Sequence, residues 1–445
     1  MLIEFRFQNF RLFKDEQILS FVASPDNSLP ENVRNLSDSE NLRILRSGVI
    51  FGANASGKTT ILDALAFTRK LIKYSAKSEP DDEIEVEPFL FDEESKSAPT
   101  SFEFTILQNG VRYQYGFSVT NERVIREWLI SYPKGRPRKL FERWVTDENK
   151  PDFVFSSYLK GEKDKLIEVT RDNALFLSVG ATFNNAQLLE VYRWFADHLV
   201  GVRTRNIDEQ MVFRNIAKNP SMLDQIKNLI SYADLGIVDL SFTERDLKID
   251  IEAMPDNISE PLRKALEAIN SAMEELKAQT PDIEGRKIYN ISMTHSVGKK
   301  LLTMPWKLES SGTRQLLCLS APIFESLSDG DFIFIDEFDN SLHPLLLREL
   351  IKLFHDPVLN TGNAQLLFNT HDTTLLSTPL LRRDQIWFVE KDQYSASHLY
   401  SLVEYSPRKD EAFEKGYLQG RYGAVPFFGE FPDGGKELEQ KKEII

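Results

Sequence analysis

The pattern of apolar and polar residues predicts two kinds of β-structure in the first third of the chain. A short apolar run at residues 49–51 is typical of a buried strand, and residues 60–67, after a glycine-rich stretch, have the spacing of a helix. Apolar and polar residues alternate over 102–106 and 111–117, on either side of an Asn-Gly pair, which predicts a β-hairpin. We therefore expect a strand–loop–helix unit beside an antiparallel layer.

The middle of the chain has helical spacing. Residues 188–199 place apolar side chains on one face of a helix, and residues 262–276 repeat them at intervals of four and three, as in a heptad seam. The seam lasts only about two heptads, which excludes a long coiled-coil arm. A helix packed on its own domain is the preferred interpretation, and a short helical hairpin is the alternative.

The last third returns to buried strands. Residues 332–335 are uninterruptedly apolar, as a strand of a parallel sheet covered on both faces requires, and Pro344 is placed to open a helix. Residues 365–368 and 385–389 are two further apolar runs. The chain is thus predicted to be an α/β protein with a parallel sheet core, an antiparallel β layer and an inserted helical subdomain.

These elements divide the chain into four expected segments. They are an N-terminal lobe with the glycine-rich loop and the antiparallel layer (1–184), a helical insertion with returning strands (185–300), a C-terminal lobe (301–404) and a C-terminal interaction segment (405–445).

Composition narrows the functional classes. The 445 residues include 54 Lys+Arg against 68 Asp+Glu, a formal net charge of −14, so bulk attraction to nucleic acid is not expected. The sequence contains no run of about 18 uncharged apolar residues, which argues against a membrane partner. A single cysteine, Cys318, excludes an internal disulfide framework and a multi-cysteine metal site, and it fits a protein of the reducing cytoplasm.

One basic stretch departs from the acidic average. It contains Lys134, Arg136, Arg138, Lys139 and Arg143, and the glycine and prolines among them predict a hairpin tip. Such a tip could contact nucleic acid or an acidic partner. A solvated turn is the alternative interpretation, and we prefer it.

The glycine-rich stretch carries the strongest functional signal. Residues 52–59 match the phosphate-binding loop pattern G-x-x-x-x-G-K-[ST], in the strand–loop–helix context that this loop requires. Backbone N–H groups and the positive helix end bind phosphate oxygens, Lys58 reaches the β- and γ-phosphates, and the Thr59 hydroxyl binds magnesium. The residues expected to contact the nucleotide are Gly52, Asn54, Ala55, Ser56, Gly57, Lys58, Thr59 and Thr60.

Acidic and histidine side chains follow two of the predicted core strands. Asp336 ends the apolar run 332–335, so it is expected at the carboxyl edge of the sheet beside the phosphate loop, where it holds magnesium. Glu337 is then placed to polarise the water that attacks the γ-phosphate. His371 follows the next strand and is expected to point toward the same phosphate. The alternative is a strand that simply ends in an acidic turn.

A second anion site is predicted about twenty residues before the acidic strand. Residues 309–315 open a helix with small hydroxyl side chains and free N–H groups, and Ser310, Ser311 and Gly312 are the residues expected to contact phosphate.

The order of these motifs resembles the ATP-binding-cassette (ABC) ATPases, in particular their soluble SMC/RecF-like branch. The sequence is most similar to the overcoming-lysogenization-defect (OLD) ATPases and their stand-alone RloA-like relatives of anti-phage systems. The signature keeps a single glycine, Gly312, of the usual Leu-Ser-Gly-Gly-Gln, and no Gln-loop residue stands out. The segments that carry the resemblance are 9–13, 52–59, 309–315, 336–344, 369–372 and 416–426.

The resemblance implies an ATP- and magnesium-dependent ATPase head that works as an oligomer. Lys58, Glu337 and His371 would be catalytic in cis, and Thr59 and Asp336 would bind the metal. The signature residues, with Asp339 as a further candidate, would act in trans on the nucleotide of another copy, so at least a dimer is required.

Three functions remain open at this point. OLD proteins carry a Toprim nuclease domain, but the residues after His371 are too few for one, so any nuclease is expected to be a separate partner. The first hypothesis is therefore a nucleotide-gated sensor or scaffold of phage defence that controls an effector nuclease. The second is a RecF/SMC-like DNA-repair ATPase that binds DNA directly, and the third is a slow nucleotide-binding scaffold.

Overall fold

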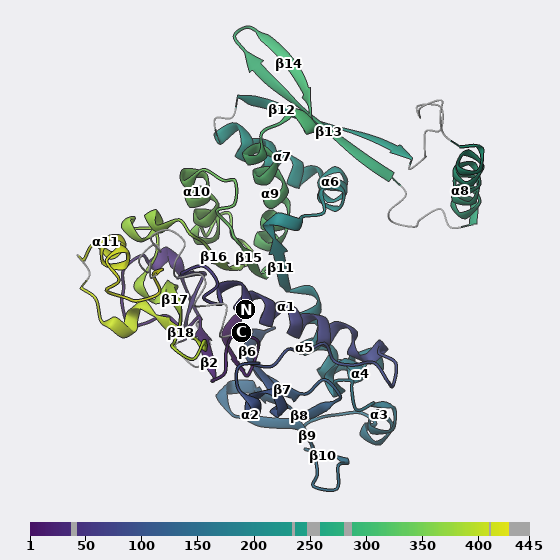
Figure 1. Cartoon of the computed structure of the whole chain (residues 1–445), viewed down its shortest axis with the longest axis vertical. Helices are drawn as coiled ribbons and strands as arrows, with labels where there is room; N and C mark the ends of the chain where they lie inside the picture. Colours follow the sequence, from purple (N-terminus) through teal and green to yellow (C-terminus); the bar gives the residue numbers. More distant parts are fainter. Residues whose placement is uncertain (37–41, 234–235, 247–258, 280–286, 409–410, 427–445) are drawn as a thin grey trace, which may run out of the picture. The chain divides into compact units, whose positions relative to one another are not determined.

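A computed structural model describes residues 1–36, 42–233, 236–246, 259–279, 287–408 and 411–426 (Figure 1). The chain forms two compact units. The first unit contains Met1–Arg203, Ser326–Asp339 and Leu347–Ile445, and the second contains Thr204–Glu325 and Asn340–Leu346. The four segments expected from the sequence stay a prediction.

A six-stranded sheet forms the centre of the first unit. Its order is β11, β15, β16, β5, β17 and β18, in which the first five strands are parallel and β18 is antiparallel to β17. All residues of β5 and the first four of β15 are buried, as the apolar runs predict. The bounds are β11 (Leu199–Arg203), β15 (Phe332–Asp336), β16 (Gln365–Asn369), β5 (Ser47–Gly52), β17 (Ile386–Lys391) and β18 (Ser397–Ser401).

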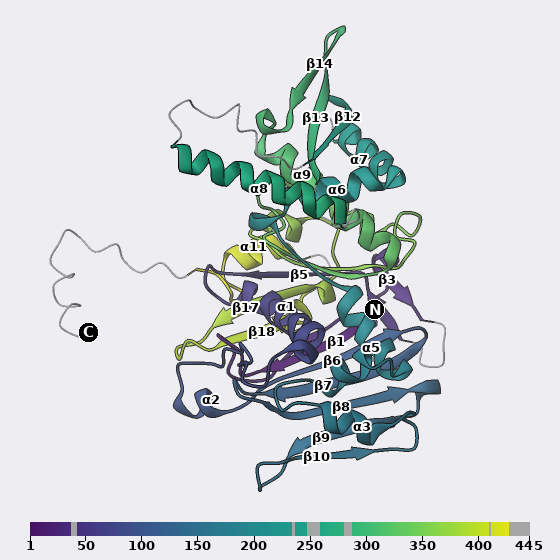
Figure 2. The same ribbon diagram turned by 90° about the vertical axis from the view of Figure 1, so that its right-hand side faces the viewer.

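A seven-stranded antiparallel sheet is the second layer of this unit (Figure 2). Its core hairpin turns at Asn109 and Gly110, whose φ angles of 47° and 76° are those of a tight turn, so the predicted hairpin is confirmed. A separate pair joins β3 (Val33–Asn35) and β4 (Arg43–Leu45). In sheet order the strands are β10 (Pro151–Phe155), β9 (Arg138–Val145), β8 (Val124–Tyr132), β7 (Val111–Val119), β6 (Thr100–Gln108), β1 (Leu2–Gln8) and β2 (Gln17–Ser20).

Helix α1 (Lys58–Tyr74) follows the phosphate-loop strand and packs against α5 (Ala186–Asp197), β11 and β15. Helix α5 ends two residues before Leu199, which is the first residue of β11, so the expected helix 188–199 is too long at its C-terminus. The other helices that lie wholly in this unit are α2 (Glu93–Ser97), α3 (Lys163–Val169), α4 (Phe176–Thr182) and α11 (Phe413–Leu418).

The start of α4 is fixed by a buried carboxylate of the antiparallel sheet. Glu127 is fully buried and accepts hydrogen bonds from the backbone N–H of Phe176 at 2.7 Å and of Leu177 at 2.9 Å. The Arg143 guanidinium, also buried, lies 3.8 Å from Glu127 and donates to Ala174 O at 3.0 Å. The expectation that Arg143 belongs to an exposed basic tip is therefore wrong, because its partner is inside the sheet.

The second unit combines helices with a three-stranded antiparallel sheet, in the order β12, β13, β14. Phe213 and Trp306 pack edge to face at 5.0 Å in its core. Two helices have residues in both units, α9 (Ser311–Asp329) and α10 (Pro344–His355). The remaining elements are α6 (Glu209–Lys218), α7 (Pro220–Tyr232), β12 (Ile237–Asp246), α8 (Glu260–Gln279), β13 (Lys287–Val297) and β14 (Lys300–Pro305).

The heptad-like residues lie on α8. Leu262 and Ile269 are 50% and 47% exposed, so the preferred interpretation, a seam packed on its own domain, is wrong for these two positions. Met273 and Leu276 lie outside the residues whose side chains the structure describes. Within the described ranges, none of the helices has the length and apolar character that crossing a bilayer requires.

Candidate functional site

The phosphate loop connects the end of β5 to the first turn of α1, and its glycines are required by close contacts. A Cβ at Gly52 would lie 2.5 Å from Val389 O in the neighbouring strand β17. Gly57 has a φ of +114°, which other residues rarely adopt, and its Cβ would lie 3.2 Å from the Phe13 ring. The loop therefore keeps its path only with glycine at both positions.

Two polar side chains hold the loop in place. Ser397 Oγ donates a hydrogen bond of 2.6 Å to Ser56 O. The Lys58 ammonium donates to Gly52 O and Ala53 O, each at 2.9 Å. Burial lowers the pKa of Lys58 to about 8, against the opposing effect of the nearby carboxylates. Those carboxylates belong to Asp336, Asp339 and Glu337.

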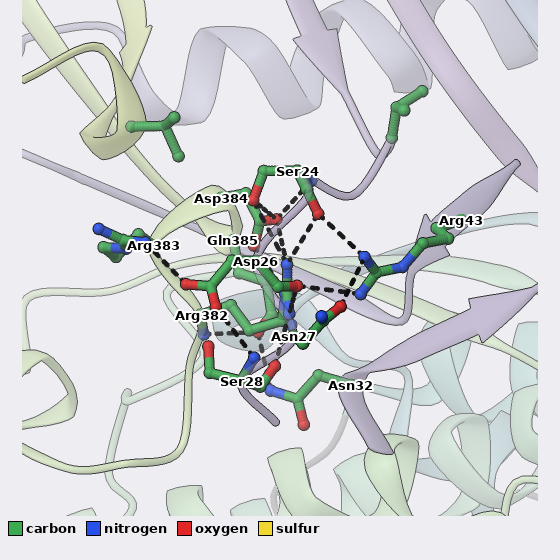
Figure 3. Close-up of polar contacts among 12 residues, drawn as sticks. Ser24, Asp26, Asn27, Ser28, Asn32, Arg43, Arg382, Arg383, Asp384 and Gln385 are labelled. Carbon is green, nitrogen blue, oxygen red and sulfur yellow. Dashed lines mark hydrogen bonds and ion pairs between the residues drawn. The ribbon is translucent and has the colours of Figure 1, made fainter. Parts of the chain in front are cut away.

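A polar network lies at the amino ends of β5 and β17, opposite the phosphate loop, and fixes where these two strands begin (Figure 3). The Arg382 guanidinium, almost fully buried, binds both carboxylate oxygens of Asp384 at 2.9 and 2.6 Å and donates to Asp26 O at 2.9 Å. Gln385 Nε2 donates to Ser47 O at 3.0 Å and to Ser47 Oγ at 2.6 Å. Because Ser47 is the first residue of β5, this network sets the position of the strand that leads into the phosphate loop.

The predicted acidic pair lies at the carboxyl end of β15, beside the phosphate loop. The Thr59 hydroxyl donates to Asp336 Oδ1 at 3.0 Å. Asn369, the last residue of β16, donates from Nδ2 to the same Asp336 oxygen at 2.6 Å and accepts from Glu337 N at 2.5 Å through Oδ1. Glu337 has a φ of +52°, an uncommon conformation for this residue, which is held by that second hydrogen bond.

Asn369 was not among the site residues selected from the sequence. The sequence places Asn369 at the end of the strand before His371. An asparagine at a strand end does not by itself indicate that its amide orients two acidic residues of a neighbouring strand. Only the parallel pairing of β15 with β16 brings its amide to them.

His371 lies two residues beyond the end of β16. Its backbone N–H donates to Asp339 Oδ2 at 3.3 Å. Burial and the Lys58 charge lower the pKa of the imidazole, while Asp339 and Glu337 oppose that change. The first unit thus brings together Lys58, Thr59, Asp336, Glu337 and His371, and their catalytic and metal-binding roles stay predictions.

A charged cluster that the sequence did not indicate lies on the first turns of α1. Asp63 forms ion pairs with Arg11, from the turn after β1, and with Arg203, at 2.5 Å, from the end of β11. Burial raises the pKa of Asp63, and the two guanidinium groups counteract that effect. Arg11 also lies 2.7 Å from Glu87. Arg203 was missed because no strand was predicted at residues 199–203, of which only Leu199 was assigned, to the end of a helix.

The signature residues belong to the second unit. Ser310 Oγ accepts a hydrogen bond from Thr313 N at 3.1 Å, so the serine caps the start of α9. A Cβ at Gly312 would lie 2.9 Å from Ser341 O, which explains why the single glycine of the signature stands there. Next to the cap, the buried Glu309 carboxylate pairs with His295 Nε2 at 2.7 Å.

The basic hairpin tip between β8 and β9 is smaller than predicted. Lys134, Arg136 and Arg138 are exposed, and Arg138 stacks on the Tyr158 ring at 4.8 Å. Lys139 pairs with Glu142 at 2.5 Å, which cancels part of its charge. Three cations thus remain as the candidate contact surface of this tip.

Two further features of the sequence have a structural explanation. Cys318 is buried, and burial raises the pKa of its thiol to about 12, so it behaves as a small apolar side chain.

The C-terminal motif, residues 416–426, packs closely on itself: a Cβ at Gly416 would lie 2.9 Å from the Tyr422 ring. Tyr417 stacks on Phe388 of β17 at 5.3 Å, so this motif attaches the segment around α11 to the central sheet.

Comparisons with known proteins give one family match and several similar solved structures. A protein-family model described as "AAA domain, putative AbiEii toxin, Type IV TA system" matches residues 49–377. The chain is similar to the SMC head domain from Thermotoga maritima, with 13% identity, 90% of this chain and 98% of that chain covered, and a TM-score of 0.40. No curated protein matches the chain.

Two other solved structures are similar at comparable levels. An SMC head bound to the C-winged helix domain of ScpA has 12% identity, with 90% of this chain and 97% of that chain covered and a TM-score of 0.38. The recombination mediator protein RecF-ATPrS of the RecFOR pathway has 14% identity, with 90% and 98% covered and a TM-score of 0.33.

Proposed function

This chain belongs to the AAA-domain family whose model it matches, and we propose that it binds ATP and hydrolyses it. The observation that carries the proposal is the hydrogen bond of 3.0 Å between Thr59 and Asp336. It joins the phosphate loop to the acidic end of β15, which is the arrangement that nucleotide hydrolysis needs. Lys58, in the same loop, supplies the cation for the phosphates.

The residues at this point fit a magnesium ion. The Thr59 hydroxyl and the Asp336 carboxylate are hard oxygen donors, and magnesium in nucleotide sites takes one or two such ligands from the protein. When bound, the ion would neutralise charge on the phosphate oxygens. Asn369 orients Asp336 for this role through its hydrogen bond of 2.6 Å.

Glu337 and His371 are the side chains proposed to act on the attacking water and on the γ-phosphate. Glu337 accepts the proton of the attacking water as the general base. Its backbone N–H is held by Asn369 Oδ1 at 2.5 Å, so the main chain that carries the carboxylate is fixed relative to Asp336. His371 contacts the γ-phosphate and senses its presence.

At the level of assembly, we propose at least a homodimer. Ser310, Ser311 and Gly312 of one copy would cover the nucleotide held by the phosphate loop of another, because the N-terminus of a helix such as α9 favours the binding of anions. ATP would then hold two heads together, and hydrolysis would release them.

The biological role that fits the motif resemblance is a nucleotide-gated sensor or scaffold of anti-phage defence in the cytoplasm, acting on a separate effector nuclease. A direct test is phage challenge of cells that express this chain together with its neighbouring genes. Protection that is lost with Lys58→Ala and requires a nuclease gene among those neighbours would support the role, and protection that is indifferent to this substitution would contradict it.

The ATPase proposal is tested with the purified chain. ATP binding is measured by isothermal titration calorimetry, and phosphate release is measured in the presence and absence of magnesium. We expect Lys58→Ala to abolish binding, because it removes the cation of the loop. A wild-type chain that binds no ATP under these conditions would refute the proposal.

A second candidate function, direct DNA binding in repair, is favoured by one observation. Lys134, Arg136 and Arg138 are exposed at the β8–β9 tip of an otherwise acidic protein. Binding to phosphate backbones would weaken steeply with salt and would be lost on neutralising Arg136 and Arg138. The absence of salt-sensitive binding by the wild-type chain would eliminate this candidate.

A further inference from the structure

The ion-paired cluster of Arg203, Asp63 and Arg11 lies beside the predicted phosphate site, but no motif of the sequence accounts for it. We propose that Arg203 is a phosphate-binding residue that exchanges partners: it leaves Asp63 and binds the γ-phosphate when ATP occupies the loop. The inference rests on the proposed function and adds to it a residue that distinguishes ATP from ADP.

The position of Arg203 follows from the register of the central sheet. It is the last residue of β11, and it pairs with Asp336 in the parallel ladder between β11 and β15. Residues that pair across neighbouring strands point to the same face of a sheet, so Arg203 and Asp336 share one face at the carboxyl edge. Asp336 in turn accepts the Thr59 hydroxyl at 3.0 Å.

The partner of Arg203 is equally close to the phosphate loop. Asp63 follows Thr59 by one helical turn of α1, so the two side chains lie on the same side of the helix. The negative charge of Asp336 is near enough to raise the pKa of Asp63. The Arg203 guanidinium, 2.5 Å from Asp63, therefore lies next to the turn that carries the phosphate-binding residues.

The charge balance of the site calls for a second cation. Three carboxylates, of Asp336, Glu337 and Asp339, act on Lys58, and the Lys58 ammonium is bonded to two loop carbonyls. A bound triphosphate adds further negative charge, which has to be stabilised for binding and for transfer. A guanidinium suits this task because its planar N–H groups bind two phosphate oxygens at once.

The exchange of partners costs little because Asp63 has two arginines. A buried carboxylate that loses its only cation is strongly destabilised. The Asp63 side chain is 13% exposed, but Arg11 stays bound to it when Arg203 leaves. The Arg203 side chain is 60% exposed, so it can move without repacking a core.

The experiment compares ATP and ADP affinities of the full chain by isothermal titration calorimetry with magnesium. We expect Arg203→Ala to weaken ATP binding about tenfold or more, the effect of losing a charge-assisted contact, and ADP binding less than about twofold. Arg203→Lys should lie between. Arg193→Ala, which removes an exposed arginine of α5, is the matched control and should change neither affinity.

A second measurement tests the exchange itself. Asp63→Asn removes the competing carboxylate, so it should tighten ATP binding when Arg203 is present and have no such effect in the Arg203→Ala background. An equal effect of Asp63→Asn in both backgrounds would overturn the exchange.

The failures of the two proposals can be told apart. If the wild type binds ATP, Lys58→Ala does not, and Arg203→Ala leaves the ATP-to-ADP preference unchanged, the role of Arg203 is overturned and the ATPase proposal stands. If the wild type binds no ATP, both are overturned.

Discussion

The Thr59 hydroxyl donates a hydrogen bond to Asp336 Oδ1 at 3.0 Å, although the two residues are 277 positions apart in the sequence. The same Asp336 oxygen accepts from Asn369 Nδ2 at 2.6 Å. One carboxylate oxygen thus connects three strands of the central sheet: β15 directly, β16 through Asn369, and β5 through the loop that ends at Thr59. The geometry of the site depends on the register of these strands.

Asn369→Ala should therefore impair catalysis more than nucleotide binding. The substitution removes the hydrogen bonds to Asp336 and to the Glu337 N–H but leaves the phosphate loop intact. We expect kcat to fall by about 10–100-fold and the affinity for ATP to change little, by analogy with the loss of partners that orient metal ligands. Steady-state ATPase assays and calorimetry separate the two effects. A larger change in affinity than in kcat would contradict the positioning role.

Replacing Glu337, the proposed general base, should slow turnover more than the loss of Asn369 does. Glu337→Gln keeps the size of the side chain but cannot accept a proton, so ATP should still bind while turnover falls by about 10²-fold or more. The ATP-bound assembly should then accumulate, which size-exclusion chromatography with ATP can detect. Equal steady-state rates for the wild type and Glu337→Gln would rule out this base.

The lowered pKa of Lys58 predicts that ATP binding weakens as the pH rises. Burial lowers its pKa to about 8, so its charge is largely lost between pH 7 and pH 9, and the affinity for ATP should fall about tenfold over this range. Lys58→Arg keeps its charge and should show a flatter profile. Calorimetric titrations at several pH values make the comparison, and parallel profiles for the two proteins would contradict the assignment.

The contribution of Lys58 to the free energy of unfolding changes with pH in the opposite direction to its contribution to ATP binding. Its pKa in the folded chain, about 8, lies below the ordinary value of 10.5, so between these pH values the unfolded chain holds more protons. This residue therefore adds stability as the pH rises from 8 to 10.5. A loss of ATP affinity in that direction cannot come from unfolding driven by Lys58, and thermal melts at each pH provide the check.

The sequence predicted those parts of the site that depend on local pattern. The phosphate loop, the acidic end of 332–336 and His371 each follow an apolar strand, and the carboxyl ends of parallel strands meet at one edge. Arg203 and Asp63 were missed because their contact depends on where β11 lies in the sheet, which no local pattern specifies. The burial of Leu262 and Ile269 on α8 was wrongly predicted for the same reason: heptad spacing shows that a helix has an apolar face and says nothing about what covers it.

The Arg382–Asp384 pair should contribute strongly to the stability of the first unit. The two side chains are 1% and 7% exposed, so Arg382→Ala leaves a carboxylate with little solvent and without its cation (Figure 3). We expect a loss of about 3–5 kcal/mol in the free energy of unfolding. Lys391→Ala is the control on the neighbouring strand β17: the Lys391 side chain is exposed, so its loss should cost about 0.5 kcal/mol or less.

Urea denaturation followed by tryptophan fluorescence can measure both variants, because Trp387 lies in β17, next to the network. Similar unfolding midpoints for Arg382→Ala and Lys391→Ala would show that the buried pair is not the main anchor of this strand.

The composite-site proposal predicts that two inactive variants restore each other. Lys58→Ala disables the phosphate loop, and Ser311→Arg places a bulky cation in the first turn of α9, at the signature. In a mixed dimer, one of the two interfaces combines an intact loop with an intact signature, so the mixture should recover part of the wild-type ATPase activity while each variant alone stays inactive. Specific activity of the wild type should also rise with protein concentration until the oligomer is saturated. Full activity from a species that light scattering shows to be monomeric with ATP bound would reject the composite site, because a single copy would then complete its own.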